Sequence, residues 1–473
     1  MKNLFGTDGI RDRAGTGLFE PRSLMILGKA LMHWIQHTYG PHTQILIAHD
    51  TRISSYCTVA ALKAGLLQGP VVLHHAALLP TPALMHLMRA DPQLQLALMI
   101  SASHNPFYDN GIKIIDAKTG KISVEDELAL SQLFHTMNTS SLIPQECAEF
   151  GIELPFIDSE KIYREKIGAL FPPQFLSGKT IVLDTAHGAT YQVAPRIFTE
   201  FGAHVITLNA NPTGYNINEQ CGALHTEQLA AAVLQHRAYA GFAFDGDGDR
   251  VIAVAAHGEI KDGDDLLALL STHPRYAHSP TIVGTIMSNE GLVQFLAQQN
   301  KRCVRTPVGD KYIAQQLQAQ QLLLGGEPSG HIIAHDIVPT GDGILVALLA
   351  LETMLMTHNH QLNTFTKYPQ VMINVPVTHR KDLNTEPFSS IIATAQQKIS
   401  NGNGGRISVR YSGTENVLRV MIEADTQETA QHTCQQLADT LAHALTQPTP
   451  VLYMSNKTQS PLASVVDGRA AVK

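Results

Sequence analysis

Three aspartates at alternate positions of one short stretch give the clearest chemical signal in the sequence. Asp245, Asp247 and Asp249 are separated by glycines and followed by Arg250. Carboxylates this close repel one another strongly unless a cation lies among them. The glycines let the backbone curl so that all three reach one ion, and oxygen-only ligands favour Mg²⁺ over zinc. The stretch therefore predicts a magnesium site, with Arg250 suited to a phosphate that the metal also touches.

The same acidic stretch could instead be a calcium loop or a solvated turn. An EF-hand calcium loop needs glycine at its sixth position and glutamate at its twelfth. The sequence has Arg250 and Ala256 there, and its flanks are typical of strands, which excludes an EF-hand. A solvated acidic turn without a metal stays open as the alternative, although aspartates at this density would be costly without a cation.

A second polar stretch, residues 101–113, contains a candidate nucleophile. It holds Ser101, Ser103, His104 and Lys113. A serine hydroxyl is a poor nucleophile unless a base or a strong electrostatic field helps it. Because neighbouring side chains point in different directions, His104 need not be the base for Ser103. A hydrogen-bonded turn would account for the same residue types, since serine, asparagine and aspartate favour turns for local reasons.

The surroundings of this stretch indicate how it would be held. The apolar runs 96–100 and 112–115 on either side of it are typical of buried strands. Asn105-Pro106 and Asn110-Gly111 are strong turn signals. We therefore expect a tight loop at the end of a buried strand, which is a scaffold that can hold a reactive side chain still.

A third loop carries groups suited to a hydroxyl-rich ligand such as a sugar. Glu327, Ser329 and His331 lie on a glycine-framed loop after the strand-like run 322–324. They offer an acceptor, a hydroxyl and a titratable imidazole. A β-turn with a chance histidine stays open as the alternative for this loop. Just upstream, residues 306–311 form another polar turn of the same unit.

Two more stretches could bind phosphate. The residues Arg410, Ser412, Gly413 and Thr414 lie between the predicted strands 406–409 and 417–422 and provide a guanidinium, two hydroxyls and a backbone amide, a compact phosphate cradle. The opening stretch 5–11 has two glycines and Arg11, and is a weaker signal because a plain N-terminal turn explains it better than an anion site does.

The spacing of apolar residues indicates the elements that position these loops. A strand, a polar turn, a helix and a second strand recur three times, with the paired strands at 45–48 and 71–73, 180–184 and 204–207, and 281–284 and 303–305. Such βαβ-like units are typical of α/β domains, so we predict three similar α/β domains in tandem. After a linker at 359–370 comes a smaller domain. The predicted boundaries are 1–155, 156–256, 257–366 and 367–446, with a loose tail at 447–473.

Composition excludes several classes of protein. The chain has 473 residues, 44% of them hydrophobic, and a net charge of −7, which argues against nucleic acid as the main partner. No signal peptide and no apolar run long enough for a membrane span is apparent. The five cysteines are scattered without C-x-x-C spacing, so we expect reduced thiols in a cytoplasmic protein.

The motifs together resemble a known group of enzymes. Ser-Ala-Ser-His-Asn-Pro at 101–106 and Asp-Gly-Asp-Gly-Asp-Arg at 245–250 are specific to the α-D-phosphohexomutase superfamily, and the resemblance extends from Phe5 to about Leu445. The opening Phe-Gly-Thr-Asp-Gly-Ile-Arg is similar to that of the bacterial phosphoglucosamine mutases. The resemblance implies three α/β domains and a smaller α+β domain around a central cleft. It also implies interconversion of glucosamine 6-phosphate and glucosamine 1-phosphate for UDP-N-acetylglucosamine synthesis, and often a homodimer.

The resemblance further implies roles for individual residues. Ser103 would be phosphorylated and would hold Mg²⁺ with Asp245, Asp247 and Asp249, and a sugar 1,6-bisphosphate would be both intermediate and activator. The other implied catalytic residues, which support charge and proton transfer, are Arg11, His104, Lys113, Arg250 and His331. The implied substrate-binding residues are Gly309, Asp310, Glu327, Ser329, Arg410, Ser412, Gly413 and Thr414. Three residues depart from the family pattern: Asp12 beside Arg11, and Tyr411 and Asn416, which we expect to loosen the phosphate loop.

Three alternative functions stay open. Within the same fold, the runner-up is a phosphomannomutase or phosphoglucomutase. A haloacid-dehalogenase-like phosphatase would use Asp245 as the nucleophile of an Asp-x-Asp pattern, but leaves the Ser103 loop unexplained. A sugar-phosphate sensor without catalysis would have no need of the nucleophile.

Overall fold

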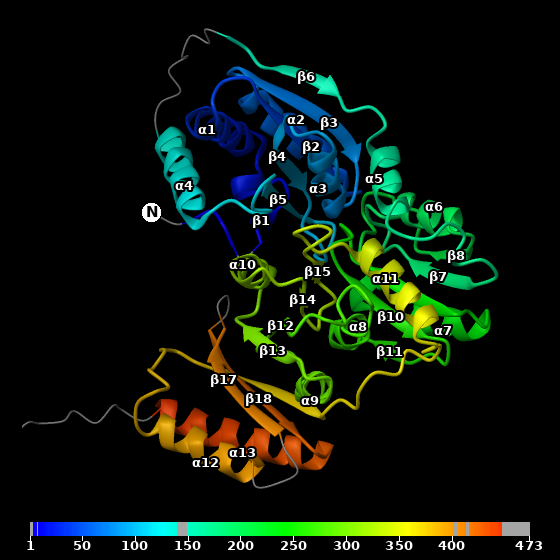
Figure 1. The fold of residues 1–473 in the computed structure, drawn as a ribbon. Helices are drawn as coiled ribbons and strands as arrows, with labels where there is room; N and C mark the ends of the chain where they lie inside the picture. Colours follow the sequence, from blue (N-terminus) through cyan, green and yellow to red (C-terminus); the bar gives the residue numbers. More distant parts are fainter. Residues whose placement is uncertain (1–2, 7, 140–148, 401–404, 413–415, 447–473) are drawn as a thin grey trace, which may run out of the picture. The chain divides into compact units, whose positions relative to one another are not determined.

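The computed structural model describes residues 3–6, 8–139, 149–400, 405–412 and 416–446. They form two compact units that divide between Tyr368 and Pro369 (Figure 1). The first unit contains three mixed α/β sheets, and the second contains one antiparallel sheet. The predicted fold class, three α/β domains followed by a smaller α+β domain, is therefore confirmed.

The first sheet carries the Ser103 loop. Its strand order is β1-β5-β4-β2-β3-β6, in which β2 is parallel to β3 and β4, and β5 is antiparallel to both β4 and β1. Its elements are β1 (Ile10–Arg13), η1 (Gly17–Phe19), α1 (Pro21–Tyr39), β2 (Thr43–His49), α2 (Ile53–Leu66), β3 (Val71–Leu78), α3 (Thr81–Ala90), β4 (Leu94–Ile100), β5 (Asp109–Asp116), α4 (Val124–Thr139) and β6 (Ile152–Pro155).

The second sheet carries the aspartate loop between two antiparallel strands. Its order is β11-β10-β9-β7-β8, with β7 parallel to β8 and β9, and β10 antiparallel to β9. Its elements are α5 (Ser159–Gly168), β7 (Thr180–Asp184), α6 (Val193–Glu200), β8 (His204–Leu208), η2 (Gly222–Leu224), α7 (Glu227–Gln235), β9 (Ala240–Phe244), β10 (Val251–Ala255) and β11 (Ile260–Lys261).

The third sheet has the order β13-β12-β14-β15 and is parallel except for β15. Its elements are α8 (Gly263–Leu270), β12 (Thr281–Thr285), α9 (Glu290–Gln298), β13 (Arg302–Thr306), α10 (Asp310–Gln320), β14 (Leu324–Gly326), β15 (Ile332–Ala334) and α11 (Gly343–Met356). The three predicted βαβ units are confirmed, because β2-α2-β3, β7-α6-β8 and β12-α9-β13 follow the expected order with parallel strands.

One apolar core joins the three sheets of the first unit. Buried side chains from all three belong to a single cluster, among them Leu84 of α3, Phe242 of β9 and Leu345 of α11. A continuous core of this kind fixes the sheets against one another, because any shift would open cavities. Loops contributed by different sheets can therefore be held at fixed distances.

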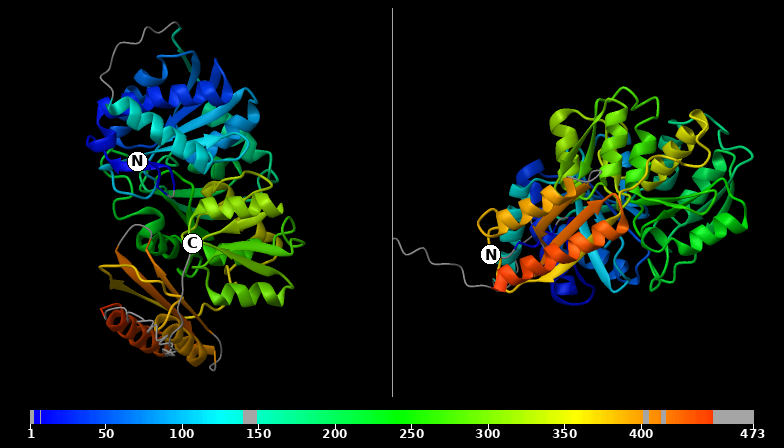
Figure 2. Two further views of the ribbon diagram at one scale, coloured as in Figure 1. Left: turned by 90° about the vertical axis from the view of Figure 1, so that its left-hand side faces the viewer. Right: turned by 90° about the horizontal axis from the view of Figure 1, so that it is seen from below.

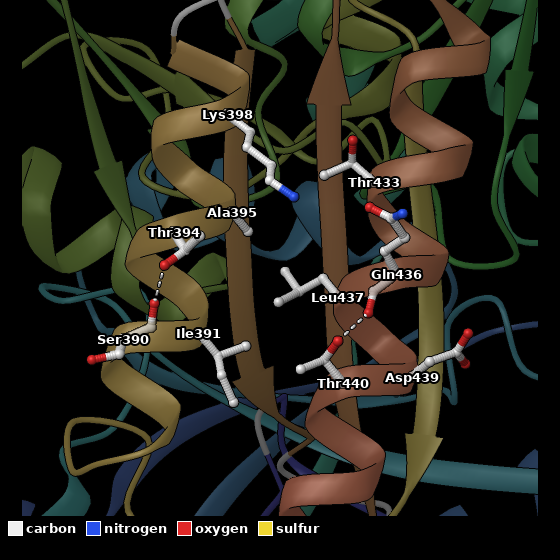
Figure 3. Close-up of a pocket in the computed structure, with 10 residues that line it drawn as sticks. All are labelled: Ser390, Ile391, Thr394, Ala395, Lys398, Thr433, Gln436, Leu437, Asp439 and Thr440. Carbon is white, nitrogen blue, oxygen red and sulfur yellow. Dashed lines mark hydrogen bonds between the residues drawn. The ribbon is translucent and has the colours of Figure 1, made fainter.

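The second unit is an antiparallel sheet of order β16-β18-β17 with two helices on one face (Figures 1 and 2). Its elements are β16 (Gln370–Pro376), α12 (Phe388–Ser400), β17 (Gly405–Tyr411), β18 (Val417–Ala424) and α13 (Gln427–Thr446). A groove of about 660 Å³ lies between α12 and α13 (Figure 3). Its polar lining includes Lys398 and Asp439, and none of its ten lining residues belongs to the predicted site.

One turn prediction is wrong. Asn110 and Gly111 lie inside β5, where they pair with Asp12 and Arg11 of β1. Gly111 is needed for close packing: a Cβ there would lie 2.3 Å from the carbonyl oxygen of Ser101. Asn110 is buried and donates a hydrogen bond to Ser54 at 2.8 Å. The Asn-Gly pair therefore serves strand packing, which the local sequence cannot distinguish from a turn.

The remaining predictions concern membrane spans, the cysteines and the end of the chain. Within the described part of the chain, no helix combines the length and apolarity needed to cross a bilayer. Four cysteines (Cys57, Cys221, Cys303 and Cys434) are present as free thiols. Cys147 and the predicted tail at 447–473 lie outside the described residues.

Candidate active site

The three aspartates meet at the end of the β9–β10 hairpin. Asp245, Asp247 and Asp249 are each at most 3% exposed, and one carboxylate oxygen of each lies within 4.8 Å of the others. The hairpin between β9 and β10 brings them there, and Gly248 at φ +75° supplies the left-handed conformation that this turn requires. The sequence-based expectation that glycines let the three carboxylates converge is therefore confirmed.

This arrangement fits a divalent cation. The pKa of Asp245 is held well above its ordinary value by burial and by the neighbouring Asp249 and Asp247. The buried Oδ1 of Asp247 has no hydrogen-bond partner among the described residues. Buried carboxylates with an unsatisfied oxygen are costly unless a cation neutralises them, and an all-oxygen set suits Mg²⁺. The residues present therefore fit the metal that the sequence predicts.

Lys113 is the ammonium group at the centre of this cluster. Its Nζ lies 2.6 Å from Asp249, 2.9 Å from Asp247 and 3.0 Å from Asp8. Burial alone would lower the pKa of Lys113, but the attraction of Asp247, Asp249 and Asp8 raises it well above its ordinary value. Lys113 is therefore charged and offsets part of the negative charge of the aspartates.

Ser103 faces the aspartates directly. It is fully buried, and its Oγ donates a hydrogen bond to Asp245 at 2.6 Å. The Nδ1 atom of His104 lies 3.3 Å from the same oxygen. Because a hydroxyl has a single proton, His104 must donate here if Ser103 donates to Asp245. Burial, Arg250 and Arg11 lower the pKa of His104 to about 3, so the imidazole is neutral.

Two arginines flank this centre. Arg11 pairs with Asp8 at 3.0 Å and approaches the Oδ1 of Asn105 at 3.4 Å. Arg250 donates its backbone N–H to Asp245 at 3.1 Å, and its guanidinium lies 3.8 Å from Asp249. Asp12 is exposed and accepts hydrogen bonds from the backbone N–H groups of Arg13 and Leu18, so its carboxylate is engaged locally.

The third sheet brings His331 and Asp310 to the aspartate cluster, and the loop of Glu327 and Ser329 lies on the same sheet. His331 lies between Asp249, at 3.6 Å, and Asp310, at 3.8 Å. Burial would lower the pKa of His331, but its contact with Asp249 outweighs this and raises it. Glu327 is buried and accepts the backbone N–H of Gly309 at 2.8 Å. Ser329 is exposed.

The phosphate loop of the second unit is described in part. Ser412 is buried, and its carbonyl oxygen accepts a hydrogen bond from Arg380 at 2.6 Å. Arg410 of β17 pairs in register with Arg419 of β18, and burial together with Arg419 lowers the pKa of Arg410. Gly413 and Thr414 lie outside the described residues. The hydroxyl of Tyr411, one of the departures from the family pattern, accepts a hydrogen bond from the backbone N–H of Lys381 and donates one to its carbonyl oxygen.

Several residues at the site were missed in the sequence. Asp8 and Lys121 complete the charge network, because Lys121 bridges Asp8 and Asp310. Thr81 donates to Asp247. Arg52 donates to the carbonyl oxygen of Ser103 at 2.9 Å and could have been found from the polar turn after the first predicted strand. Lys121 and Thr81 lie in stretches without any local signal. Asn218 contacts the Ser103 loop from the second sheet and is likewise invisible in the sequence.

The N-terminus of α8 supports the Glu327 loop and contains an unusual carboxyl group. Gly263 donates its N–H to the carbonyl oxygen of Pro328 at 3.1 Å. The next residue, Asp264, is 1% exposed, and burial followed by the nearby Asp262 raises its pKa to about 7.

The protonation of Asp264 makes the stability of the protein depend on pH. The folded chain holds this proton up to pH 7, whereas the unfolded chain releases it near pH 4, so stability is lost as the pH rises between these values. We expect the midpoint of thermal unfolding to be higher for Asp264→Asn than for the wild type at pH 8, with the difference shrinking toward pH 5. Asp158→Asn, at an exposed position, is the control. A constant difference at all pH values would contradict the assignment.

Models of known protein domains match four segments that together cover most of the chain. Residues 2–140, 163–258 and 262–370 match the phosphoglucomutase/phosphomannomutase α/β/α domains I, II and III, and residues 372–440 match the C-terminal domain of the same group. Among solved structures, a phosphoglucomutase/phosphomannomutase family protein from Burkholderia thailandensis has a TM-score of 0.77 at 20% identity, covering 93% of this chain and 98% of that one. An N-acetylphosphoglucosamine mutase from Aspergillus fumigatus, solved with GlcNAc-6P and magnesium, has a TM-score of 0.58 at 18% identity, covering 77% and 93%.

Relatives with similar sequences show which branch of this group the chain belongs to. The phosphoglucosamine mutase of Acinetobacter baylyi is 40% identical over 449 residues, which cover 93% of this chain and 99% of the relative. That of Nitrosococcus oceani is 40% identical over 457 residues, covering 94% and 99%. Identity at this level over nearly the full length of both chains, together with the converging serine, lysine and aspartates, shows that the chain belongs to the phosphoglucosamine mutase family.

Proposed function

We propose that the protein interconverts glucosamine 6-phosphate and glucosamine 1-phosphate through a phosphoserine at Ser103 and a sugar bisphosphate intermediate. The observation that carries this proposal is the position of the Ser103 hydroxyl, 2.6 Å from Asp245 in a cluster of three buried aspartates and one lysine. Phosphoryl transfer depends on positioning and charge neutralisation more than on any special covalent chemistry. A hydroxyl fixed among cation-binding groups meets both needs.

In this proposal the charged residues around Ser103 have separate roles. Asp245, Asp247 and Asp249 would hold Mg²⁺ together with the Ser103 phosphate, and a cation bound there would supply charge neutralisation for phosphoryl transfer. Lys113 places an ammonium group within hydrogen-bond distance of two of these aspartates. Arg11 and Arg250 flank the phosphoryl group, and neutral His104 keeps the serine oxygen hydrogen-bonded.

The remaining site residues bind the sugar and its second phosphate. Glu327 and Ser329 accept and donate hydrogen bonds to sugar hydroxyls, and the Gly309 amide orients Glu327. His331, which lies between Asp249 and Asp310 and has a raised pKa, is the candidate acid for the sugar oxygen. The phosphate that is not reacting is bound by Arg410, Ser412, Gly413 and Thr414. Arg410 and Arg419 support this, because they lie opposite one another on neighbouring strands, and two cations close enough to repel each other favour a bound anion nearby.

The phosphoserine is tested by mass spectrometry of the purified protein, before and after incubation with glucose 1,6-bisphosphate and Mg²⁺. We expect one phosphate, mapped to Ser103. Ser103→Ala should carry none and lose mutase activity by roughly 10³-fold or more. Ser177→Ala, at an exposed serine outside the proposed site, is the control and should still be phosphorylated at Ser103. A folded wild type without phosphate at Ser103 under either condition would overturn the mechanism.

Substrate choice is tested separately from the phosphoserine. We expect kcat/KM for glucosamine 6-phosphate to exceed those for mannose 1-phosphate and glucose 1-phosphate. The reverse order would support the phosphomannomutase or phosphoglucomutase alternative. We also propose a cytoplasmic location and a homodimer, which cell fractionation and light scattering can check.

A further inference from the structure

We infer that Arg52 and Asn218 form a two-sided clamp that holds Ser103 in the backbone conformation needed to aim its hydroxyl at the aspartates. Arg52 precedes α2 beside the first sheet, and Asn218 lies in the loop that follows β8 in the second. The inference rests on the proposed function, since it assigns a positioning role toward the Ser103 nucleophile. Arg52 and Asn218 would control the chemical step without touching the sugar.

The conformation of Ser103 needs external support. Its φ is +52°, in the left-handed region that a residue with a Cβ rarely adopts. Such a conformation persists only where surrounding contacts over-determine it. On the N-terminal side, the Ser103 N–H donates to the Oγ of Ser101 at 2.9 Å, and Ser101 in turn donates to the buried Asp50 at 2.7 Å.

On the C-terminal side, the guanidinium group of Arg52 forms hydrogen bonds to the Ser103 loop. Its Nε bonds Asp50 at 2.8 Å, its Nη2 bonds the carbonyl oxygens of Ser103 at 2.9 Å and Asn105 at 2.7 Å, and its Nη1 bonds those of Pro106 and, at 3.1 Å, Asp109. All five donors of the side chain are therefore used, and the side chain is fully buried. A fork of fixed geometry that meets four carbonyls of one loop sets the shape of that loop.

Asn218 approaches two of these carbonyls from the other sheet. Its Nδ2 donates to the carbonyl oxygen of Ser103 at 2.9 Å and to that of Asn105 at 3.0 Å. The carbonyls of Ser103 and Asn105 are thus each shared by one donor from Arg52 and one from Asn218. Because Asn218 belongs to the domain that carries the aspartates, it fixes the serine loop relative to the metal-binding loop.

The clamp is tested with variants of Asn218, which is half-buried and has φ +59°. Asn218→Asp keeps the shape of the side chain but removes the donors, and Asn218→Gly removes the side chain at a φ that glycine tolerates. We expect both to lower kcat by roughly 10-fold to 100-fold. KM for glucosamine 6-phosphate and the midpoint of thermal unfolding should stay near the wild-type values. Arg52→Lys, which keeps the charge but has three donors for five acceptors, should show a larger loss of kcat.

The matched control is Asn216→Ala. Asn216 lies in the same loop and bonds Asn211 and Thr213, but not the Ser103 loop, so kcat should stay within about twofold of wild type. A role limited to filling space would leave Asn218→Asp fully active, and a role limited to folding would lower the unfolding midpoint of the Asn218 variants in step with kcat. Either result overturns the clamp. If Ser103→Ala itself remains active, the proposed function fails and not the clamp alone.

Discussion

Lys113→Met is expected to lower kcat by roughly 10²–10³-fold and to make the folded state depend on Mg²⁺. Lys113 is the buried cation within 3.0 Å of Asp8, Asp247 and Asp249. Without it, these carboxylates lose their nearest compensating charge, and removing one partner of a buried ion pair costs about 3–5 kcal/mol. A divalent cation among the aspartates would offset much of that cost, because it stabilises only the folded chain.

The measurement is the midpoint of thermal unfolding with and without Mg²⁺, alongside kcat. The increase in midpoint on adding Mg²⁺ should be larger for Lys113→Met than for the wild type. Lys118→Met is the control, because Lys118 is an exposed lysine just after the same strand and both its activity and its Mg²⁺ response should match the wild type. An equal Mg²⁺ response in Lys113→Met and wild type would show that Lys113 does not share charge with the metal site.

The second large effect concerns a glycine between two of the aspartates. Gly246→Ala should lower kcat by roughly 10²-fold or more, because its Cβ would lie 2.6 Å from the carbonyl oxygen of Ser103 and 2.8 Å from the Nδ2 of Asn218. Neither neighbour can move freely, since the two are hydrogen-bonded to each other. The aspartate loop would have to withdraw from Ser103, which separates the hydroxyl from Asp245.

Steady-state kinetics and phosphate incorporation from glucose 1,6-bisphosphate check this prediction. Both should fall together in Gly246→Ala, while circular dichroism shows a folded protein. Gly168→Ala is the control, because a Cβ at this helical position meets nothing within 4 Å and should leave activity unchanged. Normal phosphorylation of Gly246→Ala would mean that the close approach of the two loops is dispensable.

The sequence predicts a site correctly where a chemical group and its local backbone signal lie in the same stretch. The aspartate stretch combines alternate carboxylates, glycines and apolar flanks. In the structure it forms the end of the hairpin between β9 and β10. The sequence-based prediction is wrong where a residue acts through a distant contact. Asn110-Gly111 has the sequence of a turn but lies in β5, because Gly111 is required by the passing backbone of Ser101.

The sequence by itself determined the family, the order of α/β units and the identity of the candidate nucleophile and metal ligands, because these depend on residue types within a few positions of one another. Only the tertiary structure decided that Asp8, Lys121 and Asn218 belong to the site. Lys121 reaches Asp310 across 189 positions of sequence, and Asn218 reaches Ser103 across 115. Such long-range contacts depend on how the sheets pack around their shared core, and the residues on either side of each partner in the sequence do not indicate that packing.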